Sequence, residues 1–240
     1  INNIFLSCES YILLLKLQKV TIENTLKPRV FRKGQTEIPE QDLIKLIFSN
    51  YNKLARPGTR AIPTVQVDHT LSLLRIVALG SQTLTAEVWQ AIQWRDTRLR
   101  WTPRSHYGIE SLSIPSESLW TPDIVLYNNA GDEVNRRIRA TVYFHGMVYL
   151  VLPSRLVSYC DVSNPDEKGE LHCKWKFGSW TNNGLKVNLT NSRSPDVSNF
   201  EQNSFVDVLK VDSTRNEIYY ECCPEPYPDI TYKLTLKRKQ

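Results

Sequence analysis

Residues 65–73 read VQVDHTLSL, a stretch in which Val, His and Leu alternate with polar residues. Successive side chains of a β-strand point to opposite sides, so this alternation predicts a strand with one buried face. The same pattern recurs in Leu185, Val187 and Leu189, and in Ile230, Tyr232, Leu234 and Leu236. Many such stretches separated by Pro and Gly turns predict a mainly β protein, an immunoglobulin-like antiparallel β-sandwich.

One segment near the start of this region has a helical period instead. Between Pro39 and Leu54 the apolar residues fall at helical spacing: Leu43, Ile44, Ile47, Phe48, Tyr51 and Leu54. Proline and acidic residues stand in the first turn, where they favour a helix start. We expect one N-terminal amphipathic helix that ends near residues 56–58, followed by the sandwich.

Length and charge set limits on organisation and partners. A length of 240 residues favours a single β domain, which we place at residues 36–240. A leader- or linker-like segment, residues 1–35, precedes it. That segment has short apolar runs like those of a secretory leader, interrupted by Glu9. No run approaches the roughly 20 apolar residues of a membrane span. A net charge of +5 with scattered basic residues indicates no nucleic-acid partner.

The cysteines favour an oxidising, extracellular compartment. There are five: Cys8, Cys160, Cys173, Cys222 and Cys223. Cys160 and Cys173 flank a polar loop with Pro and Gly, so we expect them to form a disulfide, with a second bridge between Cys222 and Cys223. A zinc site is the competing interpretation, but apart from His172 beside Cys173 no histidine is spaced with a cysteine as zinc ligands are. The sequence therefore predicts neither a metal nor a cofactor.

The adjacent pair Cys222–Cys223 lies between two tyrosines, Tyr220 and Tyr227. A disulfide that closes so short a ring removes little entropy from the unfolded chain, so its value lies in local shape. It would stiffen the tip of a turn and present a polarizable sulfur surface beside two rings. That combination suits a cap over a ligand.

Several aromatic residues fall on the outward face of their strands. Trp89 is out of phase with Val88 and Ile92, and Trp180 is out of phase with Phe177. The other two outward residues are Tyr149 and Val151. An outward Trp can simply cover a sheet edge, but several such residues beside a Cys-Cys turn favour a binding surface.

Aromatic rings without a cluster of acids suit a protonated or quaternary amine. Each ring face attracts a cation by about 0.5–2 kcal/mol when water is excluded. Three to five rings with apolar burial could reach the roughly −8 kcal/mol of a micromolar ligand.

Three motifs resemble the ligand-binding domain of nicotinic acetylcholine receptors, which belong to the Cys-loop receptor family. They resemble the soluble acetylcholine-binding proteins of this family equally. They are residues 120–129, WTPDIVLYNN, residues 176–180, KFGSW, and residues 220–229, YECCPEPYPD. The similarity runs from about Pro39 to about Arg238. Residues 1–34 lie outside it.

The resemblance implies a homopentameric ring with a pocket for acetylcholine and nicotine-like amines at each subunit interface. It assigns six residues to the principal face: Tyr127, Trp180, Tyr220, Cys222, Cys223 and Tyr227. It assigns three to the complementary face: Trp89, Tyr149 and Val151. The Trp180 carbonyl would accept a hydrogen bond from the ligand ammonium group, and Lys176 with Asp229 would couple binding to hairpin closure. For Trp120, Pro122 and Asp123 we expect a structural role.

The loop between Cys160 and Cys173 separates two readings within this family. Receptor channels usually carry one more residue there and an apolar tip, whereas this loop has a polar tip, residues 164–169, NPDEKG. A polar tip gains nothing from an apolar partner. We therefore expect a soluble, secreted binding protein without channel activity. The alternative is the extracellular domain of a pentameric ligand-gated channel.

Two other classes fit the chain less well. The motifs of serine hydrolases, zinc proteases and phosphate-binding loops are all missing from the sequence, so we do not expect an enzyme. An immunoglobulin-like adhesion module would not need Trp89, Trp180 and Tyr220 exposed together.

Overall fold

A computed structural model describes residues 39–131 and 138–239, which belong to one compact unit. The predicted leader- or linker-like segment, Cys8 and the predicted boundary at residue 36 lie outside the described residues. Those interpretations stay predictions.

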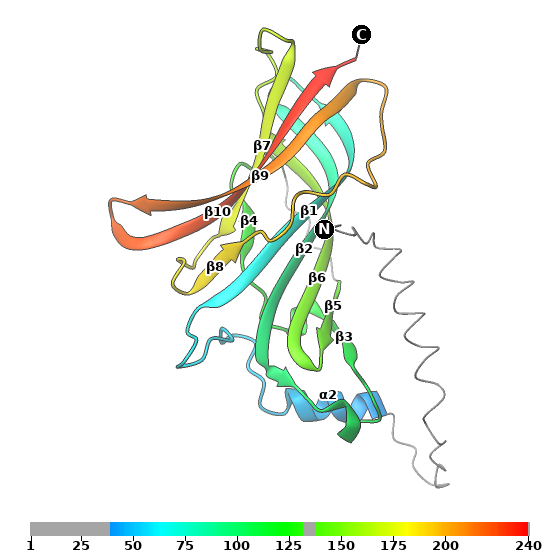
Figure 1. Cartoon of the computed structure of the whole chain (residues 1–240), viewed down its shortest axis with the longest axis vertical. Helices are drawn as coiled ribbons and strands as arrows, with labels where there is room; N and C mark the ends of the chain where they lie inside the picture. The colour runs from blue at the N-terminus through cyan, green and yellow to red at the C-terminus, as the bar shows by residue number, and fades with distance from the viewer. Residues whose placement is uncertain (1–38, 132–137, 240) are drawn as a thin grey trace, which may run out of the picture. The chain divides into compact units, whose positions relative to one another are not determined.

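Within the described residues the chain forms one α-helix, two short 3₁₀ helices and ten strands (Figure 1). In chain order these elements are α2 (Pro39–Phe48), β1 (Val65–Leu79), β2 (Thr83–Arg100), η1 (Pro103–Ser105), β3 (Ser111–Pro115), η2 (Ser116–Ser118), β4 (Ile124–Leu126), β5 (Arg139–Tyr143), β6 (His145–Tyr159), β7 (Glu170–Ser179), β8 (Val187–Thr190), β9 (Val206–Tyr220) and β10 (Cys223–Arg238).

The strands form two sheets that pack face to face. One has six strands in the order β3-β5-β6-β2-β1-β8, and the other has four in the order β4-β7-β10-β9. His69 of β1 lies between the sheets, with ring centroids 4.7 Å from Phe177 of β7 and 5.6 Å from Tyr232 of β10. The predicted mainly β sandwich is confirmed. Its one departure from an antiparallel arrangement among the described strands is the parallel pair β1–β8.

The predicted alternation holds along β1, and in β10 it is interrupted at Thr231, which is buried as well. All five odd-numbered residues of 65–73 are buried, and so are the four alternating residues of β10. Leu185 is an exception, because it is exposed and β8 begins only at Val187. The amides of Lys186 and Val187 both donate to the Asn183 carbonyl, so Leu185 lies in a turn that precedes the strand.

The helix is shorter than predicted. It ends at Phe48, and Leu54 is largely exposed. The amide of Tyr51 donates to the carbonyl of Phe48 three residues back, which tightens the chain into a turn. The Tyr51 hydroxyl then donates to Asp96 of β2 at 2.9 Å and accepts from the Trp120 amide at 2.9 Å. The tyrosine is helically spaced in the sequence, yet it anchors the turn to the sandwich.

A disulfide joins the two sheets. Cys160, just after β6 of the larger sheet, is bonded to Cys173 of β7 in the smaller sheet. Both cysteines are buried. The bond closes the loop that carries the polar tip, so that loop is held at both ends against the sandwich.

Buried His69 makes stability depend on pH. Loss of hydration lowers the pKa of this fully buried imidazole from 6.5 to about 4, despite the opposing effects of Gln90 and Asp68. Between pH 6.5 and 4 the unfolded chain takes up a proton that the folded chain refuses, so falling pH favours unfolding. We expect His69 to cost about 3 kcal/mol of folding free energy over this range. Urea unfolding between pH 4 and 8 measures the change.

The matched variant is His69→Gln, which removes the titrating ring. Its free energy of unfolding is expected to fall less steeply between pH 6.5 and 4 than that of the parent, whatever its value at pH 8. Equal slopes for the two proteins would contradict the assignment to His69.

Candidate ligand-binding site

Trp180 is held by its backbone and presents its ring to solvent. It follows the last residue of β7, and its amide donates to the Asp123 carbonyl at 3.1 Å. The Asp123 carboxylate accepts from the Thr181 amide at 2.7 Å and from Asn182 Nδ2 at 3.1 Å. Partial burial opposes ionisation of Asp123, but hydrogen bonds from Ser179, Thr181 and Asn182 prevail and lower its pKa. The Trp180 side chain itself is 72% exposed.

Asp123 and its neighbours have the structural role that the sequence predicts. Pro122 is buried, and Trp120 packs edge to face against Trp94 with ring centroids 6.1 Å apart. These contacts fix the segment before β4. That segment holds the Asp123 carboxylate beside the end of β7.

Tyr127, directly after β4, lies against the same end of β7. Its hydroxyl donates to the Ser179 carbonyl at 2.8 Å, and its ring meets Trp180 edge to face at 6.3 Å between centroids. Burial raises its pKa to about 12, with smaller contributions from Tyr220, Asp229 and Asp123. The phenol is therefore neutral at physiological pH, and it orients one ring against the other.

Gly178 is a site residue that the sequence analysis missed. A Cβ atom at this position would collide with the hydroxyl and ring of Tyr127. The available signal was a glycine inside a strand, which often marks the close approach of another group. Here the group that approaches is an aromatic ring of the candidate site.

Lys176 and Asp229 form an ion pair behind this ring pair. Lys176 Nζ lies 3.0 Å from Asp229 Oδ2 and 5.8 Å from the centroid of the Tyr127 ring. Asp229 is buried, and its Oδ1 accepts hydrogen bonds from Asn216 at 2.7 Å and Thr231 at 3.1 Å. Neither donor was predicted from the sequence. Together the four residues tie β7 to the base of the β9–β10 hairpin.

The hairpin of β9 and β10 carries the remaining residues of the predicted principal face. It extends beyond the neighbouring strands of its sheet (Figure 1). Tyr220 and Tyr227 meet edge to face at 5.3 Å between centroids. At the tip the sulfur atoms of Cys222 and Cys223 lie 2.8 Å apart as unbonded thiols. The disulfide between them stays a prediction.

The predicted complementary residues form a second exposed group, on the other sheet. Trp89 of β2 is 41% exposed, and on β6 Tyr149 and Val151 are 39% and 49% exposed. Val151 is paired with Ala91, two residues from Trp89, so these side chains share the outer face of neighbouring strands.

The two aromatic groups belong to different sheets. Trp180, Tyr127 and the hairpin belong to the four-stranded sheet, whereas Trp89 and Tyr149 belong to the six-stranded sheet. A hollow of about 550 Å³ lies elsewhere, beside α2, with Arg98, Arg100 and Trp101 in its walls.

A β-sandwich that exposes aromatic residues on two sheets and anchors a hairpin with an ion pair suits a ligand-binding domain. Residues 40–240 match the family described as the neurotransmitter-gated ion-channel ligand binding domain. The chain belongs to this family. The resemblance inferred from the three motifs is confirmed, and the family is one of ligand-binding domains rather than enzymes.

Named relatives agree with this assignment. The chain is 39% identical over 208 residues to an acetylcholine receptor subunit alpha-like protein of Manduca sexta, which covers 80% of this chain and 40% of the relative. It is 35% identical over 223 residues to the neuronal acetylcholine receptor subunit alpha-2 of Mus musculus, covering 89% and 43%. It is 37% identical over 209 residues to the human neuronal subunit alpha-4, covering 83% and 33%. The chain thus spans less than half the length of each of these relatives.

In the part of the chain that the structure describes, no helix is both long and apolar enough to cross a bilayer.

Proposed function

We propose that the protein binds acetylcholine and nicotine-like amines between the two aromatic faces of neighbouring subunits. The observation that carries this proposal is the exposure of Trp89 and Trp180, on different sheets, while the other four tryptophans are buried or partly buried. An exposed tryptophan face attracts a cation, and the attraction strengthens when a second surface excludes water.

The chemistry around Trp180 favours ring faces over acids as the cation receptor. Two carboxylates beside this group are already engaged: Asp123 accepts hydrogen bonds from Ser179, Thr181 and Asn182, and Asp229 is paired with Lys176. The ligand ammonium group therefore meets Trp180 and Tyr127. The Trp180 carbonyl is its hydrogen-bond acceptor, and the oxidised Cys222–Cys223 pair closes over it with Tyr220 and Tyr227.

Both faces on one chain suit a homopentamer. A head-to-tail contact places the principal face of one subunit against the complementary face of the next, and such contacts form a ring when the rotation between subunits closes. Light scattering of the assembly is expected to give five times the chain mass of 27.8 kDa, or about 139 kDa.

Mixed assembly tests the interface site directly. Tyr220→Ala damages only the principal face and Trp89→Ala only the complementary face, so each variant alone is expected to lose amine binding. When the two variants are co-expressed, about a quarter of the interfaces combine two intact faces and binding returns in part. Calorimetry with acetylcholine measures the number of sites and their affinity.

The control for this experiment is Tyr219→Ala, the neighbouring exposed tyrosine on β9. It is expected to retain affinity near that of the parent. Restored binding in the mixture supports a site shared between subunits. Full binding by either damaged variant on its own, or none in a mixture that has assembled, would place the ligand elsewhere.

We propose further that the protein acts as a soluble, secreted binder without a channel. The support is the polar, exposed tip of the loop closed by Cys160 and Cys173, which offers no apolar surface to a membrane domain. The second candidate is the extracellular domain of a ligand-gated channel, favoured by the names of the relatives. Expression of the complete gene separates them, because a binder appears in the medium and a channel gives amine-evoked current in the membrane.

A further inference from the structure

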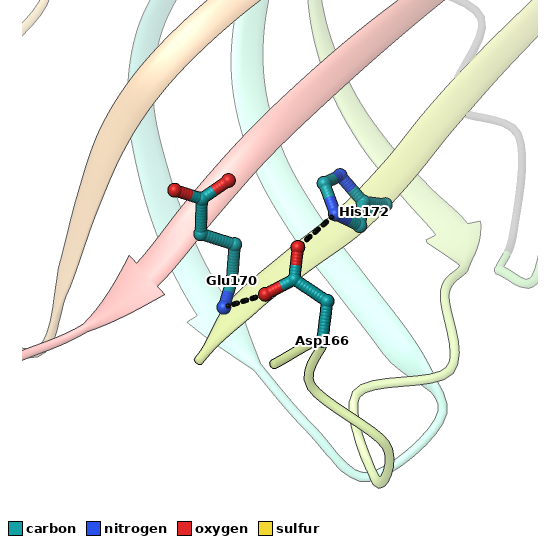
Figure 2. A group of neighbouring side chains, drawn as sticks. All are labelled: Asp166, Glu170 and His172. Carbon is teal, nitrogen blue, oxygen red and sulfur yellow. Dashed lines mark hydrogen bonds and ion pairs between the residues drawn. The ribbon is translucent and has the colours of Figure 1, made fainter. Parts of the chain in front are cut away.

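Three potential metal ligands converge in the loop between β6 and β7. They are Asp166, Glu170 and His172 (Figure 2), and one ligand atom from each lies within 4.8 Å of the other two. His172 Nε2 is 3.0 Å from Asp166 Oδ2. Asp166 and His172 are exposed, and Glu170 is partly so, which leaves the group open to ions from solvent.

The backbone holds the group together. Asp166 Oδ1 accepts hydrogen bonds from the amides of Lys168 and Glu170, both at 2.9 Å. These bonds occupy one carboxylate oxygen and turn the other toward the imidazole, as Figure 2 shows. Glu170 and His172 are two residues apart on β7, so their side chains leave the same face of the strand. Outer hydrogen bonds of this kind orient the ligands of metal sites.

The distances suit a small tetrahedral ion. Zinc binds imidazole nitrogen and carboxylate oxygen at about 2.0–2.2 Å, which separates neighbouring ligand atoms by about 3.3–3.6 Å. The group already has a 3.0 Å pair and a largest spacing of 4.8 Å or less. Rotation of exposed side chains is enough to bring the three atoms to those separations.

We propose that Asp166, Glu170 and His172 bind a divalent transition metal ion, best fitted by Zn²⁺. An imidazole with two carboxylates suits Zn²⁺, whereas Ca²⁺ takes six to eight oxygens and Mg²⁺ keeps several waters. Solvent or a residue of another molecule completes the coordination. The zinc site weighed from the sequence combined histidines with cysteines, so it did not include a histidine with two carboxylates.

Two nearby lysines oppose the binding of a metal cation. Lys237 of β10 is paired with Glu170 across the strands, and Lys174 follows His172 on the same face of β7. Their charges disfavour a purely ionic site for a cation. A coordinate bond from the imidazole offsets this repulsion, which is a second reason to expect Zn²⁺ over Ca²⁺.

A bound ion would tie the loop to the strand. One ligand comes from the loop and two from β7, and the loop is already closed by the Cys160–Cys173 bond between the sheets. The amides of Asn164 and of residues 166–169 are expected to exchange hydrogen more slowly when Zn²⁺ is added. Hydrogen exchange measured by mass spectrometry reports this change without reference to amine binding.

The direct test is a calorimetric titration of the full chain with ZnCl₂. Thiols also bind zinc, so the parent for this test carries Cys8→Ser, Cys222→Ser and Cys223→Ser. One ion per chain is expected to bind, and His172→Ala and Asp166→Asn are each expected to weaken binding about 10-fold or more. Lys237→Gln is expected to strengthen it. His106→Ala is the matched control, since His106 lies outside the cluster.

Thermal unfolding without zinc checks that each variant is folded, which the exposure of these side chains leads us to expect. Unchanged zinc affinity in His172→Ala, or no saturable zinc binding by the parent, would overturn the proposal. Equal affinities for Ca²⁺ and Zn²⁺ would also overturn it, because they would indicate simple attraction to acidic side chains. The result does not depend on whether the protein binds amines.

Discussion

Acetylcholine binding is expected to weaken by about 30- to 800-fold in Trp180→Ala, the effect of losing about 2–4 kcal/mol from a dominant aromatic contact. Trp180 is the most exposed aromatic residue of the proposed site, and Tyr127 contacts its ring edge to face. Removing the ring takes away both the cation–π attraction and the apolar surface that excludes water from the ammonium group. Calorimetry with acetylcholine and nicotine measures the loss.

Two further variants separate the contributions of this ring. Trp180→Phe keeps an apolar ring with a weaker cation–π attraction, so its affinity should fall between those of the parent and Trp180→Ala. Tyr159→Ala removes an exposed aromatic side chain elsewhere on β6 and is expected to bind like the parent. Because the Trp180 side chain is largely exposed, the fold should survive its removal. If Trp180→Ala binds acetylcholine as tightly as the parent does, Trp180 is not the main cation contact.

Strands with one face in the core were predictable from sequence, because burial imposes a period of two. The apolar residues predicted for β1 and β10 are all buried, although Thr231, on the other face of β10, is buried as well. The errors occurred where hydrogen bonding overrides periodicity. Tyr51 continues the helical pattern but is drawn to Asp96, and Leu185 continues a strand pattern inside a turn closed by Asn183.

Site residues were predictable where their side chains point away from the core in an otherwise alternating strand. They were less predictable where their role is to position another side chain. Trp89 and Trp180 stood out because the pattern puts them outside. Gly178, Asn216 and Thr231 did not, since their contribution is to position a ring or a carboxylate and depends on contacts distant in sequence. The group of Asp166, Glu170 and His172 was missed for a related reason. A turn brings Asp166 to His172, and no fixed spacing motif in the sequence signals that contact.

The largest expected loss of stability follows Asp96→Asn. The Asp96 carboxylate is fully buried, and it accepts from Tyr51 at 2.9 Å and from Arg98 Nη2 at 2.7 Å. Arg98 in turn donates to the carbonyls of Asn52 and Ala55, so one carboxylate orients the segment between α2 and β1. Removing one partner of a buried ion pair leaves the other uncompensated and costs about 3–5 kcal/mol. We expect about 3 kcal/mol, since Arg98 is partly exposed. Urea unfolding at fixed protein concentration measures it.

Asp42→Asn provides the contrast that assigns this loss to burial. Asp42 pairs with Lys45 at 3.4 Å on the open surface of α2, and exposed pairs of this kind contribute about 0–1 kcal/mol. Both variants remove one charge from one ion pair, so a difference between them reflects the surroundings of the carboxylate. Adding Arg98→Met to Asp96→Asn removes the uncompensated guanidinium and should recover part of the loss. If Asp96→Asn costs no more than Asp42→Asn, the carboxylate does not hold the α2–β1 segment, and the end of the helix at Phe48 must be fixed by the Tyr51 backbone turn alone.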